Sequence, residues 1–178
     1  ERYKSTLKLK HGKTVWFRPL LPSDEFAYRN FFYSLQDKTI YMRFFYKMRT
    51  FSHEVVQKQW ASVDYHENMS IIGLVQRGGH KEIMAIGSYA KEDENRAEVA
   101  CVVREDFQGM GIASYLLEVL EKIAKENEYK GFSATVLREN RAMIHVFKKR
   151  YPKAKLIDNT GGEVRIQMEF DTLQETTE

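Results

Sequence analysis

The most regular hydrophobic pattern in the sequence lies between positions 112 and 124. Apolar side chains recur there at intervals of three and four residues, at Ile112, Tyr115, Leu116, Val119, Leu120, Ile123 and Ala124. That spacing places them all on one face of an α-helix. The stretch therefore predicts a long amphipathic helix that packs its apolar face against a core.

Short apolar and β-branched segments precede and follow this helix, and clusters of turn residues separate them. The segments predicted as strands are 7–17, either a hairpin or one strand with a short lead, and 69–76, 82–90, 97–103, 132–137, 154–157 and 164–170. The turns at 77–80 and 92–95 are short, so the three strands that they join are predicted to form an antiparallel meander.

Further helices are predicted on both sides of these strands. One starts within 22–25, with Ser23 as its N-cap, and runs to about Leu35; the other predicted helical ranges are 39–45, 52–61 and 140–150. Helices and strands follow one another in mixed order, which indicates an α+β fold. Since no linker-like stretch or internal repeat divides the sequence, a single domain is expected over residues 1–178, with its core between about 14 and 170.

Composition narrows the class of protein. The chain has 178 residues, 43% hydrophobic and 30% charged, as is typical of a folded globular protein. A net charge of +3 is too small a surplus for a protein that binds along a nucleic-acid backbone, so no nucleic-acid partner is expected. No apolar run approaches the roughly 20 residues that cross a membrane, so no membrane partner is expected either. A start at Glu1 rather than Met suits a piece excised from a longer chain.

Cysteine and histidine usage gives two further expectations. The single cysteine, Cys101, cannot form an internal disulfide, which favours a reducing, cytoplasmic setting. Within an apolar strand its thiol is predicted to be a small buried side chain rather than a nucleophile. The histidines show no ligand spacing, so no metal site is expected; they are His11, His53, His66, His80 and His145.

The most informative join links the strand at 97–103 to the helix that begins near 112. Residues 108–113 read Gln-Gly-Met-Gly-Ile-Ala, so two glycines lead directly into the helix. Free backbone N–H groups at a helix start bind anions, and glycine lets a phosphate approach the backbone. The arrangement suits a pyrophosphate, although two glycines alone would equally serve to shape a tight turn. No Walker sequence occurs, and Ser114 stands where a Rossmann motif needs its third glycine.

These residues resemble the signature of the GNAT superfamily of N-acetyltransferases, which has Arg or Gln, two variable residues, Gly, one variable residue, and then Gly or Ala. The resemblance runs from about Thr14 to Phe170. It implies a GNAT-like fold, a twisted mixed sheet of six to seven strands flanked by helices, with acetyl-CoA bound where two central strands splay apart. The cofactor-binding residues that it implies are Gln108, Gly109, Met110, Gly111, Ile112 and Ala113 for the pyrophosphate, Cys101, Val102 and Val103 for the pantetheine arm, and Asn140 at the start of a helix.

A narrower resemblance lies in the first half of the chain. Residues 15–20, Asp24 with Glu25, Leu35 and residues 41–45 look like the GNAT domains of bacterial protein-lysine acetyltransferases. Those domains are often fused to acyl-CoA synthetase-like or other CoA-enzyme regions, and the likeness implies a protein lysine as the acceptor. Two alternatives stay open: a small-molecule amine as the acceptor, and a non-catalytic acetyl-CoA-sensing module of a larger enzyme.

Acetyl transfer to an amine requires a neutral amine, so a general base is expected near the acceptor. Glu98 is the candidate, because its carboxylate interrupts the otherwise apolar strand 97–103. A glutamate at the matching position serves as the base in the lysine acetyltransferases that this chain resembles; the alternative is a carboxylate that only faces water. No residue is assigned as proton donor to the leaving thiolate, since Phe147 stands where the superfamily often has a tyrosine, and Tyr151 lies a turn further on.

Basic residues are unevenly distributed along the chain. Seven of them lie between Arg138 and Lys155 against one acid, Glu139, so this segment carries 7 − 1 = +6 and the rest of the chain +3 − 6 = −3. Because the segment starts near Asn140, some of its charges are candidates for contacts with the phosphates of CoA. The alternative is a solvated helix face.

Overall fold

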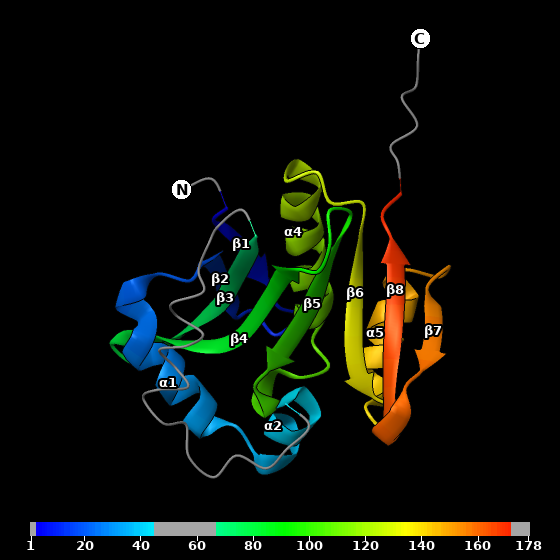
Figure 1. The fold of residues 1–178 in the computed structure, drawn as a ribbon. Coiled ribbons are helices and arrows are strands. Elements are labelled where there is room, and N and C mark those ends of the chain that lie inside the picture. The colour runs from blue at the N-terminus through cyan, green and yellow to red at the C-terminus, as the bar shows by residue number, and fades with distance from the viewer. Residues whose placement is uncertain (1–2, 45–66, 172–178) are drawn as a thin grey trace.

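The computed structural model describes residues 3–44 and 67–171. The helix expected at 52–61 lies outside these residues, as does residue 45 of the helix expected at 39–45. Within the described residues, eight strands form one sheet in the order β1-β2-β3-β4-β5-β6-β8-β7 (Figure 1). The strands are β1 (Ser5–Lys8), β2 (Thr14–Pro19), β3 (Asn68–Arg77), β4 (His80–Lys91), β5 (Arg96–Val103), β6 (Gly131–Leu137), β7 (Lys155–Asp158) and β8 (Glu163–Glu169).

Neighbouring strands are antiparallel except for β5 and β6, which are parallel. The predicted meander of β3, β4 and β5 is confirmed, and the strands predicted at 154–157 and 164–170 pair as the hairpin of β7 and β8. The described residues hold one strand more than the six to seven expected, because the first segment forms a complete hairpin. Its turn is closed by hydrogen bonds from Gly12 N–H to Leu9 O (2.9 Å) and from Leu9 N–H to Lys13 O (2.8 Å).

Helices cover both faces of the sheet. The described α-helices are α1 (Glu25–Ser34), α2 (Asp37–Phe44), α4 (Ile112–Glu126) and α5 (Arg141–Arg150). α4 and α5 lie on one face, and α1 and α2 on the other (Figure 1). The larger core lies under α4, whose apolar repeat is buried against the sheet as its spacing predicts. A Cβ at Gly87 of β4 would lie 3.0 Å from Leu120 and 3.2 Å from Leu116, so a glycine at this position lets α4 approach the strand closely.

The smaller core lies under α1, where aromatic side chains pack on the opposite face of the sheet. Tyr28, Phe31 and Phe32 of α1 are buried there together with Ile72 of β3 and Val102 of β5. β5 is therefore covered on both faces near its C-terminal end.

The start of α1 differs from the prediction. The helix begins at Glu25 after a single 3₁₀ turn at Pro22–Asp24, and Ser23 lies inside that turn and is not the N-cap. Asp24 is the N-cap of α1, but its carboxylate makes no capping hydrogen bond to the helix and turns back toward the preceding residues. It accepts a hydrogen bond from Leu21 N–H (2.8 Å) and binds the guanidinium of Arg18 at 2.6 and 2.8 Å. A carboxylate with an ion-pair partner is a stronger hydrogen-bond acceptor than a serine hydroxyl, so Asp24 rather than Ser23 fixes the turn before α1.

Candidate active site

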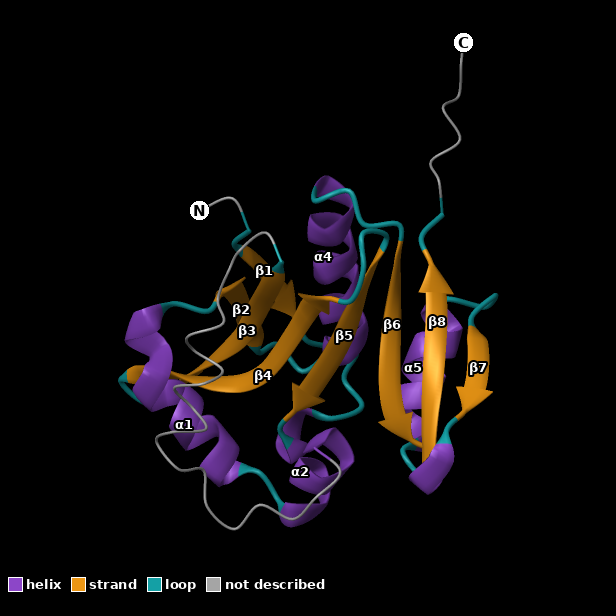
Figure 2. Cartoon of the chain, in the orientation of Figure 1, coloured by secondary structure: helices purple, strands orange, loops and turns teal. Residues whose placement is uncertain are grey.

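The two parallel strands at the centre of the sheet pair over only part of their length. β5 and β6 are in register at Arg96 with Gly131, Ala97 with Phe132, and Glu98 with Ser133. Beyond that rung the strands diverge toward their C-terminal ends (Figure 2). Alternate backbone N–H and C=O groups of residues 99–103 therefore face the space between the strands instead of a neighbouring strand. Apart from Val103 O, which accepts a hydrogen bond from the Gln108 side chain, they are available to a ligand.

A cavity of about 550 Å³ occupies the space between the splayed strands. Its walls come from residues 99–103 of β5, from the loop and helix start at 105–114, from Thr135 and Val136 of β6, from the N-terminal half of α5 and from α2. The predicted cofactor residues that line it are Cys101, Val102, Val103, Gln108, Gly109, Gly111, Ile112, Ala113 and Asn140. The sequence segments 101–103 and 108–113 and the isolated Asn140 thus meet at one cavity. Met110 does not line it, and its side chain is 39% exposed.

The glycine-containing loop between β5 and α4 has the conformation that the sequence suggested. Gly109 has φ = 77° and Gly111, the N-cap of α4, has φ = 83°, both in the left-handed region that favours glycine. No side chain caps the helix, and its first turn contains no acidic residue. The N–H groups of Ile112, Ala113 and Ser114 have no acceptor within the helix, so the positive end of α4 points its free donors at the cavity.

Two side chains hold this loop in place. The amide of Gln108 donates to Val103 O (2.9 Å), which closes the loop onto the end of β5. Arg104, only 8% exposed, binds Asp106 at 2.7 and 3.1 Å and Glu82 of β4 at 3.3 Å. Although partial burial opposes ionisation of Asp106, its bond with Arg104 holds the pKa of the carboxyl below its usual value. Gln108 therefore acts through its side chain on the loop, which leaves backbone amides to bind an anion.

Asn140 caps α5, as predicted. Its Oδ1 accepts a hydrogen bond from Met143 N–H (3.3 Å), and the residue lines the cavity. Among the seven basic residues of the segment 138–155, only Arg141 lines the cavity. Arg138 instead binds Asp158 at 2.9 Å, and Arg150 binds Glu121 at 3.1 Å. Most basic side chains of the segment 138–155 therefore do not face the cavity.

Glu98 lies at the last paired rung of β5 and β6, outside the cavity lining. Its neighbours Ala97 and Val99 are buried in the core under α4, whereas Glu98 itself is exposed. Because side chains alternate along a strand, Glu98 points to the face of the sheet that carries α1 and α2. The carboxylate is therefore accessible where the two strands begin to separate.

The remaining candidates for proton transfer or nucleophilic attack are unsuited to those roles. Burial raises the pKa of the Cys101 thiol to about 12, so the thiol stays protonated near neutral pH, as expected of a small apolar side chain. Phe147 lines the cavity and has no proton to donate. Tyr151 follows the last residue of α5, is buried beside Phe170 and does not line the cavity, and burial raises the pKa of its hydroxyl.

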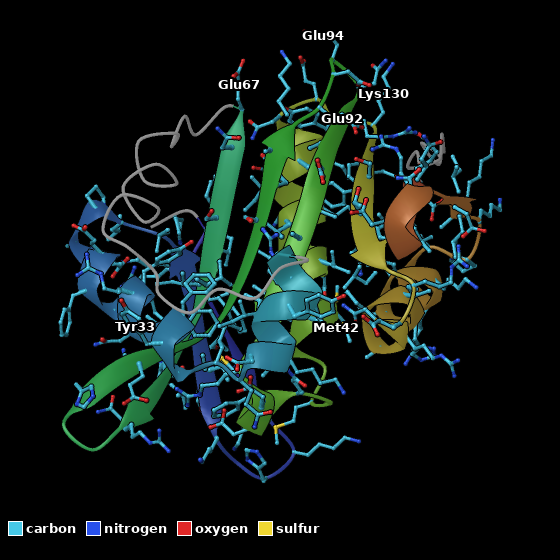
Figure 3. All side chains as sticks on the ribbon, turned by 60° about the horizontal axis from the view of Figure 1, so that its bottom comes forward. Tyr33, Met42, Glu67, Glu92, Glu94 and Lys130 are labelled. Atoms are coloured by element: carbon cyan, nitrogen blue, oxygen red, sulfur yellow. The ribbon has the colours of Figure 1, made fainter. Side chains whose placement is uncertain are left out.

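Sequence reasoning assigned no individual residue to the wall that α2 contributes. Gln36, Lys38, Thr39, Met42 and Arg43 all line the cavity. Met42 projects from α2 in Figure 3. The N–H of Gln36 donates to Glu105 Oε1 (2.7 Å), which ties the start of α2 to the cofactor-side loop. The helix was predicted, but no motif in it signals a ligand, so only the three-dimensional structure assigns it to the site.

Two kinds of feature are absent from the described residues. No set of three or more His, Cys, Asp or Glu side chains gathers where it could bind a metal ion. Within residues 3–44 and 67–171, no helix has both the length and the apolar character needed to cross a bilayer.

Comparison with known proteins gives a family match. Residues 36–151 match the model described as the acetyltransferase (GNAT) family. The chain is 29% identical to "Acetyltransferase PA5475" of Pseudomonas aeruginosa over 136 residues, which are 76% of this chain and 73% of that one. It is also 29% identical over 145 residues to "Acetyltransferase Pat" of Mycolicibacterium smegmatis, covering 80% of this chain but only 42% of that relative.

Solved structures agree with the family match. The GNAT domain of S. lividans PAT superposes with a TM-score of 0.82 at 26% identity, covering 95% of this chain and 98% of that one. A cAMP-binding acyltransferase from Mycobacterium smegmatis has the same fold, with a TM-score of 0.64 at 22% identity. This chain spans half of that protein's length.

Proposed function

The chain belongs to the acetyltransferase (GNAT) family, which makes it an N-acetyltransferase, and from that premise we propose that it acetylates the side-chain amine of a protein lysine. Acetyl-CoA is the donor and Glu98 is the general base. The 178 residues act as one domain in the cytoplasm. The observation that carries the proposal is the continuity of the open edge of β5 with the glycine loop and the free N-terminus of α4 in one cavity.

The residues of this cavity fit CoA. An anion can approach the loop backbone closely, because a Cβ at Gly109 or Gly111 would meet nothing within 4 Å. We assign the pyrophosphate to the amides of residues 108–113 and the pantetheine arm to the backbone of Cys101, Val102 and Val103. An extended amide-bearing chain beside an unpaired strand edge makes main-chain hydrogen bonds like an added strand.

Bound acetyl-CoA supplies an acetyl group activated as a thioester. Glu98 takes a proton from the acceptor ammonium, directly or through a water molecule, because an ammonium has no lone pair for attack. The neutral amine then attacks the acetyl carbonyl in a ternary complex, the C–S bond breaks, CoA leaves as the thiolate, and the second proton that the nitrogen loses passes to this thiolate through solvent. A backbone N–H near Val103 polarises the carbonyl. A thiolate is a tolerable leaving group, so the reaction proceeds without a tyrosine at position 147.

Exposure of Glu98 supports a macromolecular acceptor. An exposed carboxylate is within reach of a lysine side chain extended from another protein. The resemblance of the first half of the chain to protein-lysine acetyltransferases points to the same acceptor. A small amine remains the second candidate.

The proposal is tested by calorimetric titration with acetyl-CoA, followed by mass spectrometry of a protein mixture incubated with the chain and acetyl-CoA. Binding to one site and acetyl-CoA-dependent acetylation at lysines are expected. Binding without acetylation of any amine would support a sensing module instead. Acetylation of small amines but not of proteins would assign the other acceptor.

A further inference from the structure

Ser133 of β6 has a hydroxyl for which the fold provides no hydrogen-bond partner. Its side chain is 0% exposed, and its Oγ makes no hydrogen bond among the residues that the structure describes. Leaving a hydroxyl buried and unpaired costs free energy, because water satisfies the same group in the unfolded chain. The cost of a buried, unpaired serine hydroxyl is explained when another side chain forms a hydrogen bond with it during the catalytic cycle.

The sheet register places Glu98 directly beside this hydroxyl. Glu98 and Ser133 form the last rung that joins β5 to β6. Phe132 and Ala134 lie in the core under α4, so the side chain of Ser133 points to the opposite face, the face to which Glu98 also points. Neighbouring strands lie about 4.8 Å apart, and a glutamate side chain with three rotatable bonds spans that distance.

The other neighbour of Ser133 on this rung is Gln167 of β8. The resting structure contains no bond from Ser133 Oγ to either neighbour. Of the two, only Glu98 offers a charged acceptor, and hydrogen bonds to charged groups are about twice as strong as neutral ones. The hydroxyl is therefore matched to a carboxylate that turns toward it.

We propose that Ser133 is a positioning residue for Glu98: its hydroxyl donates a hydrogen bond to the Glu98 carboxylate while that carboxylate takes the acceptor proton. This inference rests on the proposed function. One carboxylate oxygen is held by Ser133, and the other is left to receive the proton. The bond also restricts the rotamers of an exposed side chain that the described structure otherwise leaves unrestrained.

The experiment is a double-mutant cycle in the full chain, with acetyl-CoA and a synthetic lysine peptide as substrates. Ser133→Ala is expected to lower kcat about tenfold, the loss typical of one hydrogen bond to a charged group, and to leave KM for acetyl-CoA within about twofold. In the Glu98→Gln background the same substitution is expected to have no further effect. Ser133→Thr, which keeps the hydroxyl, is expected to recover most of the activity.

Stability controls separate this role from a structural one. Removing an unpaired buried hydroxyl is expected to leave Tm unchanged or raise it, so a lower kcat at equal Tm reports on function. Ser70→Ala removes a hydroxyl from the same face two strands away from β5, and is expected to leave kcat unchanged.

Two results would overturn the inference alone: full activity of Ser133→Ala while Glu98→Gln is impaired, or an equal loss in both backgrounds. Full activity of Glu98→Gln, or no acetylation of any amine by the unsubstituted protein, would instead contradict the proposed function and the inference with it.

Discussion

The two ends of the β5–β6 pair are built differently. At the N-terminal end the strands are joined by the rungs from Arg96 to Glu98 and by a hydrogen bond from Lys130 N–H to Asn95 O (2.7 Å). An ion pair links Arg96 of β5 to Glu169 of β8 at the same end. Charged side chains that include Glu92, Glu94 and Lys130 gather there (Figure 3). At the C-terminal end the ladder stops, and the edge of β5 faces the cavity.

This difference separates two kinds of chemistry along one strand. The open end offers backbone groups, which every residue has, so binding there depends on local conformation and on free space around the glycines. The closed end offers individual side chains, Glu98 and Ser133, held by a paired sheet. Substitutions at the open end should therefore change Kd for acetyl-CoA, and substitutions at the closed end should change kcat.

The largest effect is expected from Gly111→Glu at the open end. A carboxylate at the helix start would occupy the anion position and repel the CoA pyrophosphate, so calorimetry should show Kd for acetyl-CoA raised at least about 100-fold. Gly111→Ala is the matched control, since it carries the same strain at φ = 83° without the charge. A similar loss in both variants would assign the effect to backbone strain rather than to the anion site.

At the closed end, Glu98→Gln is expected to lower kcat about 100-fold or more, the contribution typical of general-base catalysis, while Kd for acetyl-CoA stays within about twofold. Steady-state kinetics and calorimetry on the same preparation check both values. Glu94→Gln removes one exposed charge from the neighbouring hairpin and should leave both unchanged. An unchanged kcat in Glu98→Gln would remove Glu98 from the mechanism.

A smaller effect is expected from Arg104→Met, which removes the anchor of the loop. Glu82 and Asp106 would lose their shared partner, so Tm should fall by several degrees and Kd for acetyl-CoA should rise about five- to tenfold.

Ion pairing with Arg104 holds the pKa values of the Glu82 and Asp106 carboxyls below their usual range despite partial burial. Groups with a lowered pKa stabilise the folded state above their unfolded pKa of about 4 and lose that contribution as pH falls below it.

The stability difference between the parent chain and Arg104→Met should therefore be full at pH 6 and shrink as the pH falls below about 4. Thermal melts across this range measure it. A difference that stays constant down to pH 3 would contradict the ion-pair explanation.

The smallest effect concerns Cys101, within the open end. A thiol with a pKa of about 12 is ionised in about one molecule in ten thousand at pH 8. Its reaction with a disulfide reagent should be at least about 100-fold slower in the folded chain than in denaturant. Equal rates would show that the thiol is reactive, and would reopen the nucleophile interpretation.

The two ends also differ in how far the sequence could predict them. The glycine loop of the open end has the conformation that the sequence predicts, because two glycines between a strand and an amphipathic helix are a local pattern. The divergence of the two strands was implied only by the resemblance to the GNAT superfamily. No residue of the α2 wall was assigned from the sequence, because its place in the site depends on contacts with Glu105 and β5, which are remote in sequence.

Local side-chain competition and strand register explain the other differences. Ser23 was expected to cap α1, but the nearby Asp24 has both an ion-pair partner and a backbone donor. Ser133 has no motif that marks it in the sequence, because a serine in an apolar strand is common and only the strand register places it beside Glu98. Glu98 itself was found as an exception to its apolar neighbours.

Amide hydrogen exchange with and without acetyl-CoA tests the central claim most directly, since that claim concerns backbone groups at the open end. Added acetyl-CoA should slow exchange at residues 99–103 and 108–114 and leave the β1–β2 hairpin unchanged. Protection confined to other parts of the chain, under conditions where calorimetry shows saturation, would contradict the assignment of this cavity to acetyl-CoA.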